Sequence, residues 1–303
     1  MIKRLISTLA CLCLLAGAIT PVLAAEPQSG VLALLGELNI MQGDPNGDMR
    51  LDDPVTRAEF TKAAVASSSF RNSVASNLAI SPFPDVTYQH WAAPYVRVGV
   101  TNGLVSGYPD ATFQPDSGVL YEEAITIMLR VLGYTDADFG VSWPYGQLGM
   151  AGNLDMTDHI DCSAGQVMDR GQVAQLIYNT LCAKMKDQSV QLVSLFDVQL
   201  LEDVTLIADN KDDPSIASDE IFTSGGTLKT NAGFDRSALG RKGDAAVKNG
   251  NKLIAFMPAP DSSANEEFVV YSVLTDTVIA YQNGSMTQID IDGNTTVYKG
   301  KSQ

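Results

Sequence analysis

A four-residue turn motif occurs twice in the chain, 64 residues apart, and the residues after it keep the same spacing. Gly43-Asp44-Pro45-Asn46 corresponds to Gly107-Tyr108-Pro109-Asp110. Four later positions agree at that offset: Met49 with Phe113, Asp52 with Asp116, Val55 with Val119, and Glu59 with Glu123. Proline and asparagine or aspartate at these places are typical of turns. A fixed internal offset predicts a fold built by duplication of one structural unit.

Helical patterns flank both copies of the turn. Apolar residues recur every three residues before the first turn, at Leu32, Leu35, Leu38 and Met41. A similar pattern precedes the second turn, at Ala92, Tyr95, Val96 and Gly99. After the first turn, Thr56 and Glu59 have the spacing of a capping box, which predicts a helix starting there. Each unit is therefore predicted to be a helix, a loop and a second helix.

A third, weaker copy of the unit follows Trp143-Pro144-Tyr145. Three of its residues match the second copy at an offset of 50: Tyr145 with Tyr95, Gly149 with Gly99, and Leu154 with Leu104. Arg170, in the string Met168-Asp169-Arg170-Gly171-Gln172, is the best match to Arg57 of the first copy. The second copy has Tyr121 at that position.

These landmarks together resemble the S-layer homology (SLH) repeat. The resemblance is carried by Phe83-Pro84-Asp85-Val86, His90-Trp91-Ala92, Gly103, the segment from Gly107 to Phe113, Pro115, and the string Val55-Thr56-Arg57-Ala58-Glu59. It covers roughly residues 31–184. It implies a mainly α-helical module of three SLH-like repeats, at about 31–70, 81–134 and 141–184, packed around a shared core.

The resemblance also implies a ligand and a site. SLH proteins are held non-covalently on Gram-positive envelopes by a secondary cell-wall polysaccharide that carries pyruvate ketals. A guanidinium can bind a ketal carboxylate with two parallel hydrogen bonds. The residues that match the family's binding positions are Arg57, with Arg170 as a weaker match, and Trp91, Gly107, Asp110, Gly43 and Asn46. The alternatives are that Trp91 anchors the core and that Arg57 is a solvated charge at a helix end.

The pattern changes from helical to strand-like past Lys186. Short runs rich in Val, Ile, Thr and Phe predict a β-rich domain over residues 190–303, with an Asn283-Gly284 hairpin turn. The predicted strands are Leu192–Leu200, Val204–Ala208, Glu220–Thr223, Lys252–Phe256, Glu267–Leu274, Val278–Tyr281 and Met286–Ile291. The predicted fold class is thus a multidomain α plus β protein, helical module first.

Residues 1–24 have the features of a secretory signal peptide. Lys3 and Arg4 precede an apolar stretch, and Val22-Leu23-Ala24 offers small residues for cleavage. No later segment is long and apolar enough to span a bilayer. The formal net charge of −15 argues against a nucleic-acid partner, because nucleic acids are polyanions.

The chain offers few groups for catalysis or metal binding. His90 and His159 lie in different repeats without a nucleophile pattern, and no cofactor motif is present. Asp44 to Asp48 is unlike a calcium loop, because Met49 and Val55 stand where an EF-hand needs Gly and an acid. Cys162 and Cys182 are expected to be free thiols, although export would permit a disulfide.

The sequence therefore predicts a non-catalytic exported protein at the cell wall or S-layer surface, anchored by polysaccharide binding. Two alternatives stay open. One is a wall-targeted enzyme, such as a glycan or peptidoglycan hydrolase, with its chemistry in the C-terminal region. The other is a structural S-layer array protein, and self-association is open in either case.

Overall fold

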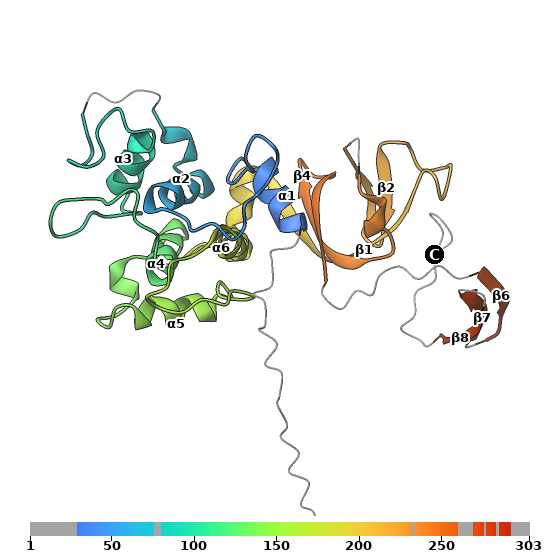
Figure 1. The fold of residues 1–303 in the computed structure, drawn as a ribbon. Helices are drawn as coiled ribbons and strands as arrows, with labels where there is room; N and C mark the ends of the chain where they lie inside the picture. The colour runs from blue at the N-terminus through green and yellow to red at the C-terminus, as the bar shows by residue number, and fades with distance from the viewer. Residues whose placement is uncertain are drawn as a thin grey trace, which may run out of the picture.

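The computed structural model describes residues 29–75, 80–231, 234–259, 269–275, 277–282 and 285–291. The predicted signal peptide and the Asn283-Gly284 turn lie outside these ranges. Helices occupy the first half of the described chain and strands the second half (Figure 1). The predicted combination of α and β structure is confirmed.

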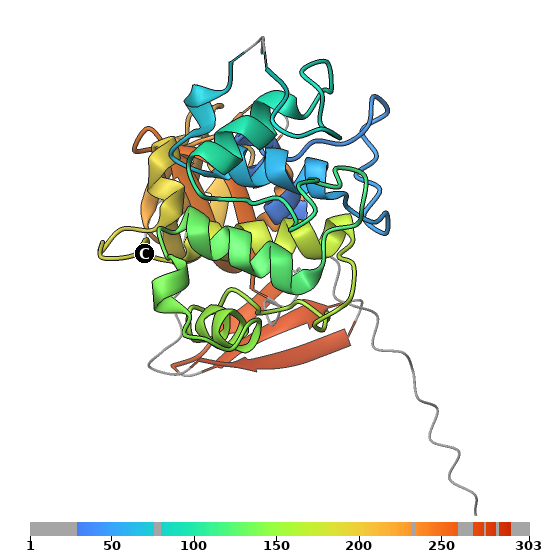
Figure 2. The ribbon, with the colours of Figure 1, turned by 90° about the vertical axis from the view of Figure 1, so that its left-hand side faces the viewer.

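The helical half contains six α-helices within the described residues. They are α1 (Ser29–Glu37), α2 (Arg57–Ser67), α3 (Ala93–Thr101), α4 (Tyr121–Val131), α5 (Tyr145–Asn153) and α6 (Arg170–Cys182). Two short 3₁₀ turns, η1 (Arg71–Ser73) and η2 (Asp136–Asp138), follow α2 and α4. Figure 2 shows this half of the molecule facing the viewer, with strands behind it.

Helices α2 and α6 begin with a complete capping box, and α4 begins with one half of it. At α2, Glu59 N–H donates to Thr56 Oγ1 at 3.2 Å and Thr56 N–H donates to Glu59 Oε2 at 2.9 Å, which confirms the predicted capping box. Asp169 and Gln172 make the same reciprocal pair at α6. At α4, Glu123 Oε2 accepts from the backbone N–H three residues earlier, at 3.1 Å. These contacts satisfy N–H groups that a helix start would otherwise leave unpaired.

Three backbone hydrogen bonds form a closed ring at the centre of the helical half. Val55 N–H donates to Met168 O at 3.0 Å, Met168 N–H donates to Val119 O at 3.1 Å, and Val119 N–H donates to Val55 O at 2.9 Å. The three side chains are almost fully buried. Burial of side chains of this size contributes about 1.5–3 kcal/mol each. The ring therefore joins three segments that are far apart in the sequence.

A second set of bonds joins the same three units outside the ring, with donors and acceptors in the opposite cyclic order. The first residue of each helix donates its N–H to the segment that enters the neighbouring helix. The pairs are Arg57 N to Ser117 O at 2.8 Å, Tyr121 N to Gln166 O at 2.9 Å, and Arg170 N to Asp53 O at 2.9 Å. The side chains of these three first-turn residues are thus held against the loop of the next unit.

The second half forms a closed five-stranded barrel. Its strands are β1 (Val198–Asp209), β2 (Glu220–Thr223), β3 (Gly226–Lys229), β4 (Lys242–Lys248) and β5 (Lys252–Pro258), in the order β1-β2-β3-β5-β4. Strand β4 returns beside β1, which is the Greek-key order. Five strands closed in this order have the architecture of the OB-fold. The 3₁₀ turn η4 (Arg236–Ala238) lies between β3 and β4.

Part of the strand prediction is wrong. The predicted strand Leu192–Leu200 begins instead as a 3₁₀ helix, η3 (Leu192–Phe196), and only its end joins β1. The apolar side chains of η3 are buried in the cluster that joins the helical half to barrel residues such as Val198 and Ala246. Strands β3 and β4 were not predicted: β3 has only four residues, and β4 has a single β-branched residue, Val247. Only glycine fits at Gly243, where a Cβ would lie 2.2 Å from Met257 O.

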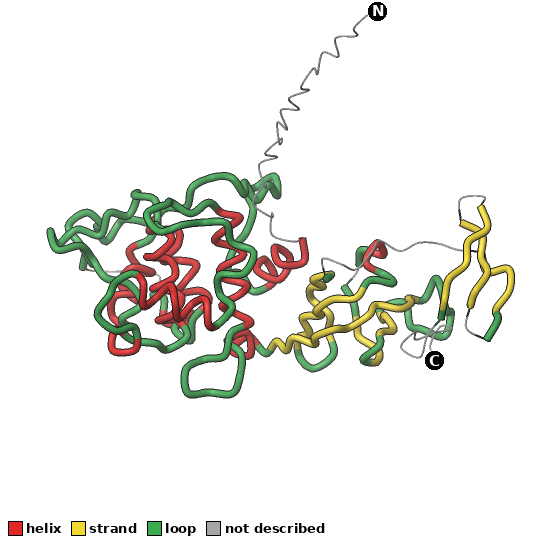
Figure 3. Tube along the Cα trace, turned by 90° about the horizontal axis from the view of Figure 1, so that it is seen from below, coloured by secondary structure: helices red, strands yellow, loops and turns green. Residues whose placement is uncertain are grey.

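Helix α1 packs against the barrel as well as against α6. Its residues Val31, Leu34 and Leu35 are buried in one apolar cluster with Ile254 and Met257 of β5. At Gly30 an added Cβ would lie 2.0 Å from Phe256 O, so the helix backbone directly touches β5. Figure 3 shows the helices and the barrel strands as adjacent parts of the molecule. One apolar cluster therefore crosses the predicted boundary near Lys186, while a second cluster, which includes Leu206 and Ile221, belongs to the barrel alone.

A separate three-stranded antiparallel sheet follows the barrel. It consists of β6 (Val269–Val273), β7 (Thr277–Gln282) and β8 (Ser285–Asp290), in that order. Strands β7 and β8 pair with Gln282 opposite Ser285. The predicted pairing of these two segments is confirmed.

Cys162 and Cys182 are free thiols, as expected. Burial raises the pKa of Cys182 to about 12. This thiol therefore stays protonated at physiological pH and is a poor nucleophile.

The contact of α1 with the barrel predicts that adding a methyl group at Gly30 lowers the stability of the protein. Gly30→Ala should destabilise the protein by about 1–3 kcal/mol, the usual cost of overpacking, because its Cβ meets backbone rather than a flexible side chain. Gly36→Ala on the same helix is the control, since its Cβ meets only Met41 O at 4.0 Å. Urea unfolding of both variants measures the difference. Equal stability of the two variants would contradict the packing of α1 on β5.

Candidate functional site

Two grooves in the helical half contain most of the residues singled out from the sequence. Groove A, of about 510 Å³, is lined by Gly43, Glu59, Lys62, Trp91 and Arg170 among others. Groove B, of about 220 Å³, is lined by Arg57, Gly107, Tyr108, Glu123, Arg130 and Trp143 among others. Both lie where the first turn of one helix meets the loop of the next unit.

In groove A, Arg170 is fixed by the loop of the first unit. Its Nε donates to Met49 O at 2.7 Å and its Nη2 donates to Gln42 O at 3.0 Å. The remaining terminal nitrogen, Nη1, has no partner among the described residues. Two of the three guanidinium nitrogens therefore position the group, and the third can bind a ligand.

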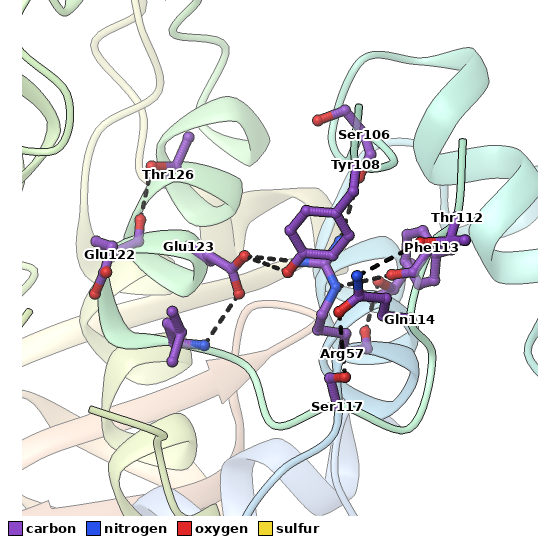
Figure 4. A network of polar contacts seen from close by, with 12 residues as sticks. Arg57, Ser106, Tyr108, Thr112, Phe113, Gln114, Ser117, Glu122, Glu123 and Thr126 are labelled. Carbon is purple, nitrogen blue, oxygen red and sulfur yellow. Dashed lines mark hydrogen bonds and ion pairs between the residues drawn. The ribbon is translucent and has the colours of Figure 1, made fainter. Parts of the chain in front are cut away.

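In groove B, Arg57 makes the same contacts as Arg170. Its two acceptor residues lie 64 positions after those that Arg170 contacts. Its Nε donates to Phe113 O at 3.0 Å and its Nη2 donates to Ser106 O at 3.2 Å (Figure 4). Here Nη1 is also occupied, by Glu123 Oε1 at 3.0 Å. The guanidinium lies over the rings of Tyr108 and Phe113, at 4.5 and 4.9 Å from their centroids. All the hydrogen-bonding nitrogens of Arg57 are therefore used within the protein.

The surroundings of Arg57 are not those of a solvated charge at a helix end. Arg57 is only 6% exposed, so that alternative is wrong. Tyr108 completes the network by donating its hydroxyl to Glu123 Oε1 at 2.8 Å. Burial and this hydrogen bond raise the pKa of Tyr108 to about 12, so the phenol stays protonated.

The two grooves differ in how their charges are paired. Groove A is lined by two cations, Arg170 and Lys62, and by one carboxylate, Glu59. Glu59 Oε2 accepts hydrogen bonds from Thr56 in the capping box. Lys62 is exposed and forms no ion pair among the described residues. In groove B, Arg57 pairs with Glu123, and Arg130 pairs with Asp136 at 2.7 Å. Each groove is therefore lined by two cations and one carboxylate. They differ in that Arg57 pairs with Glu123, whereas Arg170 has no ion-pair partner among the described residues and is suited to an anion.

The third equivalent position carries no guanidinium. Tyr121 occupies it, is 7% exposed and has a raised pKa because of burial. Its neutral side chain cannot bind an anion by charge.

Trp91 is at the surface rather than in the core. It is 51% exposed and stacks on His90 with ring centroids 5.8 Å apart. The alternative that Trp91 anchors the core is therefore wrong.

The predicted turn residues have different surroundings. Gly43 and Gly107 line the grooves, and a Cβ at either would meet neighbouring atoms within 3 Å, so both loops require glycine. Asp110 and Asn46 are exposed at the loop tips and line neither groove. Asp110 accepts hydrogen bonds from Thr112, which lower its pKa. Their observed role is to shape the turns.

Comparison with known proteins agrees with the geometry. A family model described as the S-layer homology domain matches residues 26–61 and 82–125. The chain therefore contains S-layer homology segments, and relatives that match it are named as cell-surface and cell-wall proteins. Within the described residues, no helix has the length and apolar character needed to cross a membrane.

Three relatives illustrate the similarity of this chain to named surface proteins. A cell surface protein of Thermoanaerobacter kivui is 28% identical over 87% of this chain and 37% of its own length. A middle cell wall protein of Brevibacillus brevis is 29% identical over 51% of this chain and 14% of its own. A cellulosome-anchoring protein of Acetivibrio thermocellus is 32% identical over 32% of this chain and 22% of its own. The chain thus spans 37% or less of the length of these relatives.

Sequence reasoning missed three residues of the grooves. Lys62 and Trp143 line grooves A and B, and Glu123 neutralises Arg57. The offset of 64 residues relates Glu123 to Glu59. That correspondence predicted only that Glu123 caps a helix, and not that it pairs with Arg57. Trp143 could have been found, because it precedes α5 as Trp91 precedes α3.

The burial of Arg57 changes the expected effect of its removal. Arg57→Ala should destabilise the protein by about 3–5 kcal/mol, because it leaves the partly buried Glu123 carboxylate and two carbonyls without their partner. Arg57→Lys should recover only part, since an ammonium cannot make the same three contacts. Arg97→Ala, at an exposed site on α3, is the control and should stay within about 0.5 kcal/mol of the parent. Chemical denaturation checks this, and a fully stable Arg57→Ala would contradict the structural role.

Proposed function

We propose that the protein is a non-catalytic anchor that binds an anionic, pyruvylated secondary cell-wall polysaccharide through groove A. The observation that supports this most directly is the free Nη1 of Arg170 beside Lys62 in a groove with an exposed Trp91. A ketal carboxylate would pair with Arg170, and the apolar face of the sugar would pack on the indole ring.

The anchor is proposed to be a module of three SLH-like repeats over residues 31–184. The cyclic hydrogen bonds of Val55, Val119 and Met168 support this, because they relate three helix starts in the same way. Arg170 then belongs to the third repeat but binds across to the loop of the first. The β-rich region at 190–303 would be the part displayed by the anchor.

Arg170 rather than Arg57 is proposed to dominate binding. The sequence favours Arg57, because it has the intact Val-Thr-Arg-Ala-Glu string. The geometry supports Arg170, because Arg57 already has an internal carboxylate partner at 3.0 Å. Arg57, Gly107 and Asp110 would then shape groove B and its loop, while Gly43 and Asn46 do so for groove A.

The test is sedimentation of the protein with purified cell walls. Arg170→Ala should lose about 1.5–3 kcal/mol of binding free energy, the range for hydrogen bonds to charged groups, which is a tenfold to hundredfold weaker Kd. Arg170→Lys should retain part of the affinity. Walls stripped of secondary polysaccharide should bind neither the unmodified protein nor its variants. Arg97→Ala is the matched control and should bind untreated walls as the unmodified protein does. Unchanged binding by a folded Arg170→Ala protein would overturn the assignment of groove A.

The same experiment also tests whether the protein hydrolyses the cell wall. Release of soluble sugar or peptide from the walls by the purified protein would contradict a non-catalytic anchor.

A further inference from the structure

A cavity of about 410 Å³, pocket C, lies between helix α1 and the barrel. Its walls come from the first turn of α1, from strand β5 and from the segment that runs through η4 to Arg241. Pocket C shares no lining residue with groove A or groove B. Its volume falls in the range of about 300–1,000 Å³ that is usual for small-molecule sites. It is therefore a candidate site separate from the grooves of the helical half.

Pocket C forms where two barrel strands separate. Strands β3 and β5 pair only at Lys229 and Lys252, and β5 then continues to Pro258. Helix α1 packs along this part of β5, with Gly30 close to Phe256 O. A helix does not follow the edge of a strand as another strand would. Pocket C is the space that this arrangement leaves beside α1.

The inner wall of pocket C is apolar. Leu253, Ile254 and Ala255 of β5 are buried, and Phe234 and Phe256 are partly buried. Aromatic and aliphatic side chains of this kind stabilise a ligand by removing its apolar surface from water. The pocket is therefore suited to a molecule with an apolar body.

Arg241 is the one cation among the described residues that line pocket C. Its Nε is buried and has no hydrogen-bond partner within the described chain. Its guanidinium forms no ion pair there either, whereas Arg236 of η4 is paired with Asp209 and Asp212. A buried donor without a partner costs free energy, and such groups are rare in folded proteins. Arg241 is therefore available to an anionic group in the pocket.

The one carboxylate that lines pocket C is already used. Asp235 Oδ1 accepts from Ser237 N–H at 2.9 Å, and Asp235 Oδ2 accepts from Ser237 Oγ at 2.7 Å. The first turn of α1 adds the positive end of a helix dipole, which favours an anion. A single negative charge can pair with Arg241, but a second one would be repelled by Asp235. The charges of the pocket therefore favour a monoanion over a dianion.

We propose that pocket C binds a small organic monocarboxylate with an apolar body, such as an aryl-substituted acetate. The carboxylate would accept two parallel hydrogen bonds from Arg241. The apolar body would lie against Phe234 and Phe256. This site would give the barrel a ligand of its own, independent of the binding of the helical half to the wall.

The test uses fluorine NMR of the full protein with 4-(trifluoromethyl)phenylacetate as the probe. Its signal should shift and broaden until the site is saturated. The matched neutral amide, 4-(trifluoromethyl)phenylacetamide, should bind at least tenfold more weakly, because it cannot make a charge-assisted pair. Trifluoroacetate, which has the charge without the aryl group, should also bind at least tenfold more weakly. Equal binding of the acid and the amide, or no saturable binding of the acid, would overturn the proposal.

Three variants locate the probe in pocket C. Arg241→Gln should weaken probe binding at least tenfold, and Phe234→Ala at least fivefold. Lys211→Gln, which removes one exposed positive charge outside the pocket, is the control and should bind as the unmodified protein does. Thermal melting shows that each variant is folded. Unchanged probe binding by a folded Arg241→Gln protein would overturn the assignment to pocket C.

The same variants keep this proposal apart from the proposed function. Arg241→Gln should sediment with cell walls as the unmodified protein does, and Arg170→Ala should bind the probe normally. If Arg241→Gln does not fold, the comparison of acid and amide on the unmodified protein, together with Phe234→Ala, decides the proposal. Loss of probe binding in Arg170→Ala would contradict an independent site in the barrel.

Discussion

The ring of backbone hydrogen bonds among Val55, Val119 and Met168 is the contact on which the helical half depends. It brings three helix starts together and places the first-turn side chain of each helix against the loop of the next unit. The grooves are a consequence of this arrangement, since each forms at one such junction. Because the ring uses backbone atoms, the side chains at the junctions can differ, and they do: Arg170, Arg57 and Tyr121.

One carboxylate accounts for the main difference between the two grooves. Glu123 reaches Arg57, whereas Glu59, at the equivalent place, is bonded to Thr56 and leaves Arg170 with a free nitrogen. The same guanidinium geometry thus has a structural role in groove B and is available to a ligand in groove A. The packing of α1 on β5 connects these grooves to the barrel through one continuous apolar cluster.

The sequence predicted helices and the capping box at Thr56, because periodicity and spacing are local signals. The groove residues Gly43, Gly107, Trp91 and Arg170 came from the resemblance to the SLH repeat. The sequence did not predict that Arg57 is buried or that Glu123 is its partner, since ion pairing between units depends on tertiary contacts. It missed β4, which has a single β-branched residue and a glycine, Gly243, where a Cβ would meet Met257 O. The docking of α1 on β5 was also missed, because its amphipathic pattern does not show what covers it.

A crystal structure of the protein soaked with a small sugar that carries a pyruvate ketal tests the account most directly. The account predicts the ligand in groove A, with its carboxylate within about 3 Å of Arg170 Nη1 and its ring on Trp91. The Arg57–Glu123 pair in groove B should remain intact. A ligand carboxylate bound to Arg57 with Glu123 displaced, and groove A empty, would contradict it.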